Sequence, residues 1–298
     1  MSSPNIQVTE RDLKILKLVA EYRFLRSSHI PLLIAGSKDK LTRRLSTLAE
    51  IGLLERLSVR RAIRSWGGSE SRVYGLGREG ARLLQAKTPL PFDRLGSLAR
   101  HQQHESVEHE LMISDFMTPL AAACRRHEHI RLIDSATLRQ AVFGKPKTFV
   151  WSVSVTERNL PRRLTVFPDH AFALWDTRRP ENQQPAYFFF EADRGTMPVV
   201  RRSFDQTSYF RKLVAYHETW RQLLHTRYFR FPNFRVITLT SSRERLAHLL
   251  EVNKQFNDGA GSGLFLFAEQ AALQTHGNPL TLPLKSGRGE AVTRLADG

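Results

Sequence analysis

The chain of 298 residues is long enough for one large or two ordinary domains, each with a core of its own. Its composition, 41% hydrophobic and 25% charged, is that of a soluble globular protein, and no apolar run approaches the ~20 residues of a membrane span, which excludes a membrane-spanning protein. The net charge of +16 is densest over residues 1–100, where 19 Lys and Arg stand against 9 Asp and Glu, and it indicates a polyanionic partner such as nucleic acid.

The first 88 residues predict a winged-helix DNA-binding domain. A capping-box-like start at Thr9-Glu-Arg-Asp12 opens a first helix, and Pro31 falls in the first turn of a second helix over 27–34, where proline is tolerated. The other elements that we expect are a third helix over 37–51, strands over 52–57 and 71–76, and a closing helix over 78–86. Three helices, a strand, a basic loop and a second strand form the element order of bacterial winged-helix domains.

The third of these helices carries the residues that we expect to meet DNA. In a winged-helix domain it enters the major groove, while the loop between the strands reaches phosphates or the minor groove. The predicted DNA contacts are Lys40, Thr42, Arg43, Arg44, Ser46 and Thr47 of the helix and Arg60, Arg61 and Arg64 of the loop. A winged helix used only for protein contacts is the alternative, and the dense positive charge argues against it.

Two prolines in Thr88-Pro-Leu-Pro-Phe92 indicate a domain boundary, so that a second domain is expected over 98–277. It opens with a long amphipathic helix that runs from His101 to about residue 126. A zinc-protease helix needs histidines four residues apart, whereas His104 and His109 are five apart and about 140° apart around the helix, which argues against zinc. His109 is retained as a candidate catalytic residue.

The rest of the chain predicts a mixed-sheet α/β domain of the restriction-endonuclease type, followed by a flexible tail over 278–298 that is polar with Pro and Gly. The expected strands lie over 130–133, 165–174, 186–193, 234–239 and 264–267, and the expected helices over 203–227 and 243–256. Residues 136–164 are expected to be irregular.

Three acids mark the centre of this domain. Side chains alternate along a strand, so Glu191 and Asp193 project on the same side, and Asp169 joins them if its strand is the neighbour. Such a cluster repels itself unless a cation sits in it. Because all three ligands are carboxylates, the expected cofactor is a hard ion, Mg²⁺ or Mn²⁺, held by Asp169, Glu191 and Asp193. Ordinary capping and ion pairing of these acids is the simpler alternative.

Pro168-Asp169, followed after 21 residues by Glu191-Ala-Asp193, resembles the Pro-Asp…(Asp/Glu)-x-Lys nuclease motif. With the winged helix ahead of it and the phrase Phe-Phe-Phe-Glu-Ala-Asp-Arg-Gly-Thr, the chain resembles the replication-relaxation family, which includes the MobC-type relaxases of mobilisable plasmids. The resemblance covers most of residues 8–270. It implies the nicking of one DNA strand at a transfer or replication origin with a divalent metal ion.

The resemblance also implies roles for particular residues. Asp169 and Glu191 match the metal-binding acids, while Asp193 stands where the motif has lysine, and Lys212 of the following helix is placed to supply that lysine. Tyr209 is the alternative nucleophile if a covalent DNA intermediate forms. The expected phosphate contacts of this domain are Arg194, Arg201 and Arg202.

Two classes of function are open at this point. One is a metal-dependent DNA nickase of the relaxase kind; the other is a non-catalytic DNA-binding accessory factor or transcriptional regulator with a degraded nuclease core. The expected partners are double-stranded DNA, single-stranded origin DNA and other relaxosome or conjugation proteins, and a homodimer is left open. Cys124 is the only cysteine and Met1–Asn5 shows no signal-peptide pattern, so we expect the bacterial cytoplasm.

Overall fold

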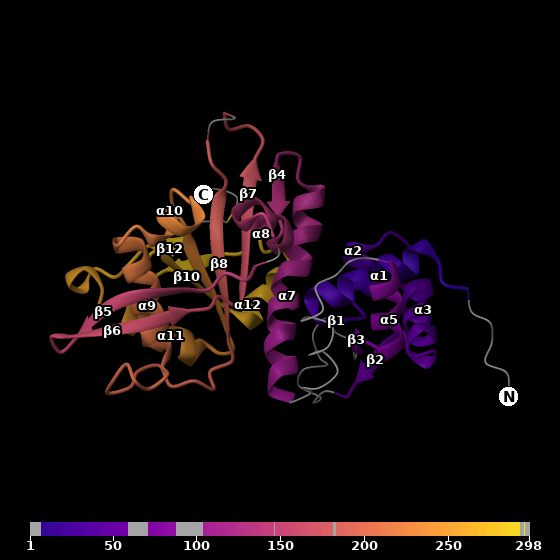
Figure 1. Ribbon diagram of the computed structural model, residues 1–298, viewed down its shortest axis with the longest axis horizontal. Coiled ribbons are helices and arrows are strands. Elements are labelled where there is room, and N and C mark those ends of the chain that lie inside the picture. Colours follow the sequence, from indigo (N-terminus) through magenta and orange to yellow (C-terminus); the bar gives the residue numbers. More distant parts are fainter. Residues whose placement is uncertain are drawn as a thin grey trace. The chain divides into compact units, whose positions relative to one another are not determined.

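The computed structural model describes residues 7–58, 71–87, 104–145, 147–180, 183–292 and 295. The chain divides into two compact units, residues 1–118 and 119–298. The helices and strands of both units are labelled in Figure 1, and they confirm the predicted mixed α/β class. No helix in these described ranges is long and apolar enough to cross a membrane. The predicted linker, Thr88–Phe92, lies outside them.

The first unit has a small sheet surrounded by helices. Its elements are α1 (Glu10–Tyr22), β1 (Phe24–Arg26), α2 (Ile30–Leu33), α3 (Lys38–Glu50), β2 (Leu54–Leu57), β3 (Val73–Leu76), α5 (Arg78–Lys87) and the first part of α7 (His104–Arg126). The sheet is antiparallel in the order β1-β3-β2. The capping box is confirmed, because Thr9 Oγ1 accepts from the Asp12 amide at 3.3 Å and Asp12 Oδ2 accepts from the Thr9 amide at 2.8 Å.

The second helix is shorter than the sequence suggests, because the chain before it enters the sheet. Phe24 lies opposite Gly75 in the β1–β3 pair, and a Cβ built on Gly75 would come within 3.1 Å of the Phe24 ring. The glycine therefore makes room for an aromatic side chain in the core. Residues 24–26 form their backbone hydrogen bonds with β3, and the helix therefore begins only at Ile30.

A buried ion pair fixes α7 within the first unit. The Asp115 side chain is fully buried and accepts from Arg26 Nε at 2.7 Å and Arg26 Nη2 at 3.0 Å. His29 Nδ1 accepts from the Arg26 amide, and His29 Nε2 lies 3.0 Å from Asp115 Oδ1. Around this pair Phe24, Val73, Val107 and Leu111 form an apolar cluster.

The second unit is built on one large mixed sheet. Its elements are β4 (Ile130–Ile133), α8 (Ser135–Phe143), β5 (Trp151–Glu157), β6 (Leu160–Val166), β7 (His170–Asp176), β8 (Ala186–Asp193), α9 (Tyr209–Arg221), α10 (Leu224–Phe229), β9 (Arg235–Thr240), α11 (Arg243–Asn253), β10 (Phe265–Glu269), α12 (Gln270–His276), β11 (Leu284–Ser286) and β12 (Ala291–Val292). Seven of the strands form a sheet in the order β12-β11-β10-β9-β8-β7-β4. Its centre, β8-β9-β10, is parallel, and the outer pairs are antiparallel.

One face of this sheet is covered by α9, α11 and the separate β5–β6 hairpin (Figure 1). Their apolar side chains meet in one cluster, in which Trp151, Phe189 and Tyr216 are buried. Glu191 belongs to the same side of β8 as Phe189, because residues two apart on a strand share a face. The acidic end of β8 therefore lies under α9, at the edge of an aromatic core.

Three sequence-based element assignments are wrong. Residues 136–164 hold α8 and the β5–β6 hairpin, whose alternation in Trp151-Ser-Val-Ser-Val155 puts Trp151, Val153 and Val155 in the core. The strand expected over 165–174 is two strands separated at Pro168, which lacks an amide hydrogen for a ladder. The helix expected over 203–227 begins at Tyr209 and is interrupted at Leu223, which has a φ of 53°.

The predicted flexible tail over 278–298 is also wrong in the part that the structure describes. Strand β11 pairs with β10, and β12 pairs with β11, which extends the sheet at its edge. Leu280, Leu282 and Leu284 are between 0% and 2% exposed. The apolar residues of this segment thus complete the core, although its polar composition favours a tail.

We expect Leu282→Ala to lower the free energy of unfolding by about 2–5 kcal/mol, because it leaves a cavity in the core. The matched control is Leu160→Ala, since that side chain is 58% exposed and its loss is expected to change stability by less than about 0.5 kcal/mol. Urea denaturation measures both. Equal midpoints for the two variants would contradict the packed position of residues 280–284.

Candidate active site

Strand pairing brings two of the three predicted acids together. In the antiparallel pair β7–β8, His170 lies opposite Phe190, and continuing that register by one residue sets Asp169 opposite Glu191. Asp169 Oδ2 accepts from the Ala192 amide at 2.8 Å, which holds its carboxylate against the backbone of β8 next to Glu191. Asp169 and Glu191 are therefore neighbours, because the register of β7 and β8 sets them opposite each other.

Glu191 is buried and held by α9. Its side chain is 2% exposed, Lys212 Nζ donates to Oε2 at 2.6 Å, and the Tyr216 hydroxyl donates to Oε1 at 2.6 Å. Lys212 and Tyr216 are four residues apart and share one helix face. Burial and then the charge of Asp169 raise the pKa of Glu191 to about 7, although the hydrogen bonds from Lys212 and Tyr216 act in the opposite direction.

Lys212 remains a cation in this setting. Burial lowers the pKa of its ammonium group, but the charges of Glu191 and Asp169 outweigh that effect and raise the pKa above its ordinary value. Burial and the neighbouring Glu191 raise the pKa of the Tyr216 phenol, so that it stays protonated and donates its hydrogen bond. Lys212 thus places a permanent positive charge beside the carboxyl groups of Glu191 and Asp169.

Asp193 has different partners from Glu191, although it projects on the same side of β8. Arg245 of α11 binds its carboxylate through both branches, with Nε to Oδ2 at 2.6 Å and Nη2 to Oδ1 at 2.9 Å. Thr240 of β9 adds a hydrogen bond to Oδ2 at 3.0 Å. Among the described residues there is no group of three or more His, Cys, Asp or Glu side chains that could hold one ion, so the expected three-carboxylate arrangement is not found there.

The other residues expected in the active site lie in less suitable places. The Tyr209 side chain is 2% exposed and its hydroxyl shares a hydrogen bond of 2.8 Å with Thr238 Oγ1. Burial raises the pKa of this phenol well above its ordinary value, which is unfavourable for a nucleophile. His109 lies on α7 in the first unit, whereas the acids belong to the second.

The predicted arginines of this unit lie on the segment between β8 and α9. Arg201 and Arg202 are exposed, and the Arg202 carbonyl accepts from Arg158 Nη2 at 3.1 Å. Arg194 is half-buried at the end of β8. Exposed guanidinium groups are suited to phosphate contacts.

A cavity of about 150 Å³ opens onto Glu191 and Lys212. It lies between β6 and the first turn of α9, and Phe167, Ser208 and Arg211 also line it. Ser208 caps α9 by accepting from the Arg211 amide at 3.2 Å. The buried Arg211 Nε has no hydrogen-bond partner in the described part of the chain. The positive end of a helix, a lysine and an unpaired guanidinium nitrogen make this cavity suited to an anion such as a phosphate.

Arg211, Tyr216 and Arg245 are site residues that we did not predict. A signal for the first was present, because α9 has basic residues and no acid in its first turn, the reverse of the usual preference. Tyr216 lies four residues after Lys212 and so shares its face of α9. The partner of Asp193 depends on which helix covers the end of β8, and local sequence does not carry that information.

In the first unit, α3 presents part of the expected DNA-contact surface. Lys40 and Arg43 are exposed, and Thr42, Ser46 and Thr47 are half-buried. Arg72 Nη1, which was not predicted, donates to Ser46 Oγ at 3.2 Å and extends this surface. The loop residues Arg60, Arg61 and Arg64 lie outside the described ranges.

Arg44 differs from its neighbours on α3, because its guanidinium group binds the protein itself. Arg44 Nε donates to Asp12 Oδ1 at 2.8 Å and Nη2 to Asp12 Oδ2 at 2.6 Å. Burial acts to raise the pKa of Asp12, but hydrogen bonds from Arg44 and Thr9 outweigh it and hold the pKa at about 2. We therefore assign Arg44 a structural role in place of the predicted DNA contact, because it links α3 to Asp12 of α1.

The comparisons with known proteins give a match to a protein family. The family model described as Replication-relaxation matches residues 16–233, a span that contains α3, both acids and Lys212. No curated protein and no solved structure gives a significant match.

The raised pKa of Glu191 predicts a pH dependence of stability. The folded protein, with a pKa of about 7 at this carboxyl, binds the proton more tightly than the unfolded chain, whose value is 4.5. This contribution is therefore fully present below pH 4.5 and is lost as the pH rises through 7. We expect the loss to be on the order of 1–3 kcal/mol.

The measurement is the free energy of unfolding of the wild type and of Glu191→Gln between pH 4.5 and 8. The variant, which has no proton to lose at this position, should show a flatter profile over that range. Glu244→Gln removes an exposed acid and should leave the wild-type profile unchanged. Parallel profiles for the wild type and Glu191→Gln would contradict the raised pKa.

Proposed function

The chain belongs to the replication-relaxation family, and from this premise we propose that it nicks one DNA strand at the transfer or replication origin of a plasmid or mobile element. The membership itself supports a role in the replication or relaxation of such DNA. The observation that carries the finer proposal is the meeting of Asp169, Glu191 and Lys212 beside an anion-accepting helix end. We propose that it works in the bacterial cytoplasm, where plasmid DNA resides.

The acid pair fits a hard divalent cation. Asp169 and Glu191 offer only oxygen ligands, and their mutual repulsion is part of the raised pKa of Glu191. Mg²⁺ is commonly held by one or two carboxylates together with waters and substrate phosphate oxygens, so two acids are a sufficient protein donor set. When bound by Asp169 and Glu191, Mg²⁺ or Mn²⁺ would polarise a phosphodiester and lower the pKa of a coordinated water.

The chain's own residues supply the rest of the chemistry. Lys212 places its charge where the negative charge of the phosphate grows during cleavage, and Arg211 and the amino end of α9 bind the phosphate oxygens. Tyr216 keeps the Glu191 carboxylate in one orientation. Because the Tyr209 hydroxyl is buried, we propose water as the nucleophile in place of a tyrosine.

The first unit would bring this site to its DNA. In the winged-helix interpretation, α3 enters the major groove with Lys40 and Arg43, and the loop of Arg60, Arg61 and Arg64 follows the backbone. Arg201 and Arg202 would then contact the strand that is cut. Single-stranded origin DNA and other relaxosome proteins are the partners that such a reaction requires.

A non-catalytic accessory factor is the second candidate, and one observation favours it. Both oxygens of Glu191 already accept hydrogen bonds, and Asp193, in place of the motif's lysine, is held by Arg245. A metal ion would have to displace the Lys212 ammonium or the Tyr216 hydroxyl from Glu191. If that rearrangement does not occur, the same contacts keep a nuclease-like core folded without activity.

Nicking of supercoiled DNA that carries the cognate origin separates the two candidates. With Mg²⁺ or Mn²⁺ we expect the wild type to convert it to open circles, and we expect Asp169→Asn and Glu191→Gln to lower the rate at least about 100-fold. Both variants should bind the DNA as tightly as the wild type. The control is Asp205→Asn, an exposed acid on the same segment as Arg201. Binding without nicking by the wild type would establish the accessory candidate.

The surface of α3 gives a separate prediction. Arg43→Ala should weaken duplex binding at all sequences and reduce the slope of log K against log salt by about 1, because one phosphate contact is lost. Arg82→Ala removes an exposed arginine of α5 and should leave the slope unchanged. Fluorescence anisotropy at several salt concentrations measures the slope for each variant. A slope for Arg43→Ala equal to that of Arg82→Ala would show that α3 does not contact the DNA.

A further inference from the structure

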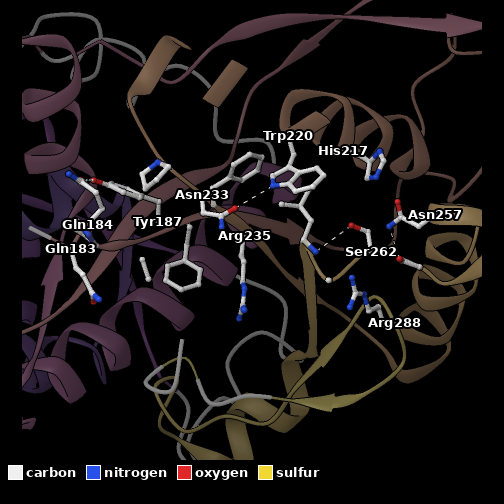
Figure 2. Close-up of a pocket in the computed structure, with 18 of the residues that line it drawn as sticks. Gln183, Gln184, Tyr187, His217, Trp220, Asn233, Arg235, Asn257, Ser262 and Arg288 are labelled. Atoms are coloured by element: carbon white, nitrogen blue, oxygen red, sulfur yellow. Dashed lines mark hydrogen bonds between the residues drawn. The ribbon is translucent and has the colours of Figure 1, made fainter. Parts of the chain in front are cut away.

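A second hollow among the described residues of the second unit lies away from the acids. A cavity of about 840 Å³ opens at the amino ends of β8 and β9, where Tyr187, Phe188 and Arg235 line it (Figure 2). The last turn of α9 and the glycine-rich loop over 259–263 form its other walls. Glu191 and Asp193 stand at the opposite, carboxyl end of β8. The proposed nicking reaction does not use this cavity.

The charge around the cavity is positive. Arg235 and Arg288 line it, and in the described part of the chain neither guanidinium group has an ion pair with an acid. None of the described residues that line the cavity is acidic. In Figure 2, Arg235 and Arg288 lie below Trp220. Two guanidinium groups without an ion pair, among described lining residues that include no acid, attract an anion.

An exposed aromatic side chain stands over these cations. Trp220 is 46% exposed, and its indole Nε1 donates to Asn233 Oδ1 at 3.3 Å, which fixes the plane of the ring. Tyr187 stacks on Phe231 at 3.9 Å and donates its hydroxyl hydrogen to Gln184 Oε1 at 2.9 Å. Aromatic rings held in this way are platforms on which a nucleobase stacks. Amide side chains beside them offer donors and acceptors to a base edge.

The glycine-rich loop over 259–263, which forms another wall of the cavity, lies close to the end of β11. Gly261 has a φ of +70°, and a Cβ there would meet the Gly287 carbonyl oxygen at 2.2 Å, so only glycine allows the loop to approach that strand end. Asn257 Nδ2 donates to the Gly261 carbonyl at 2.8 Å. A Cβ on Gly263 would lie 3.7 Å from Arg288 Nε, which places the guanidinium group directly beside the loop. The cation therefore has a defined position.

We propose that this cavity binds a nucleotide unit, with the base against Trp220 and its phosphate between Arg235 and Arg288. Two ligands contain such a nucleotide unit: a single DNA strand and a free nucleotide. A DNA strand would connect the two sites, because α9 carries Lys212 in its first turn and Trp220 in its last. Those residues are eight apart, about 12 Å along the helix axis.

The test uses the full-length protein in EDTA with two probes, a labelled single-stranded oligodeoxythymidylate and thymidine monophosphate. We expect Trp220→Ala and the double variant Arg235→Ala/Arg288→Ala each to weaken oligonucleotide binding about tenfold or more. The charge-matched control is Arg227→Ala/Arg243→Ala, which removes two exposed arginines that do not line the cavity and should change binding less than twofold. Duplex binding, measured in parallel, should be equal in all variants and shows that they are folded.

The two probes identify the source of the ligand. Binding of the oligonucleotide alone assigns the cavity to a DNA strand, whereas binding of the monophosphate with competition between the probes assigns it to a nucleotide; both support the proposal. Wild-type affinity for both probes in the cavity variants would overturn it. An equal loss of binding in the charge-matched control would also overturn it, since the effect would then be one of net charge.

Discussion

A carboxylate buried beside a second carboxylate loses its charge unless a cation comes with it, and this constraint governs the centre of the second unit. Glu191 is 2% exposed and has Asp169 as its neighbour across the β7–β8 pair. Desolvation of a carboxylate is unfavourable by several kcal/mol, and the repulsion between the acids adds to it. Lys212, 2.6 Å from Glu191, offsets part of both effects, so that the position of α9 and the charge of the site depend on each other.

The two acids at the end of β8 show how one strand serves two purposes. Glu191 faces α9, where Lys212 donates to it and a small cavity is lined by both residues. Asp193, two residues later, is bound by the planar fork of Arg245 and by Thr240, an arrangement that is rigid and leaves little room for a ligand. We therefore propose a chemical role for Glu191 only, and assign to Asp193, whose position in a nuclease motif would ordinarily hold lysine, the docking of α11.

Local sequence was sufficient where the determinants lie within one element or one strand pair. The capping box at Thr9 and the side of β8 that carries Glu191 followed from spacing, whereas the approach of Asp169 was predicted only if its strand is the neighbour of β8. The ion pair between Asp193 and Arg245 could not be predicted from spacing. The two residues are 52 positions apart and meet only after α11 has packed on the sheet. The edge strands after residue 278 were missed for a similar reason, since their polar composition favours a loop and only pairing with β10 makes them strands.

The central claim is that Asp169 and Glu191 together form a cation site next to Lys212. Titration of the protein with Mn²⁺, followed by electron paramagnetic resonance in the presence of uncleaved DNA, tests it most directly. We expect one bound ion for each chain in the wild type and loss of that ion in Asp169→Asn and in Glu191→Gln, whereas Asp193→Asn should retain it. Binding of Mn²⁺ that is unaffected by the first two substitutions, or no binding at all, would contradict it.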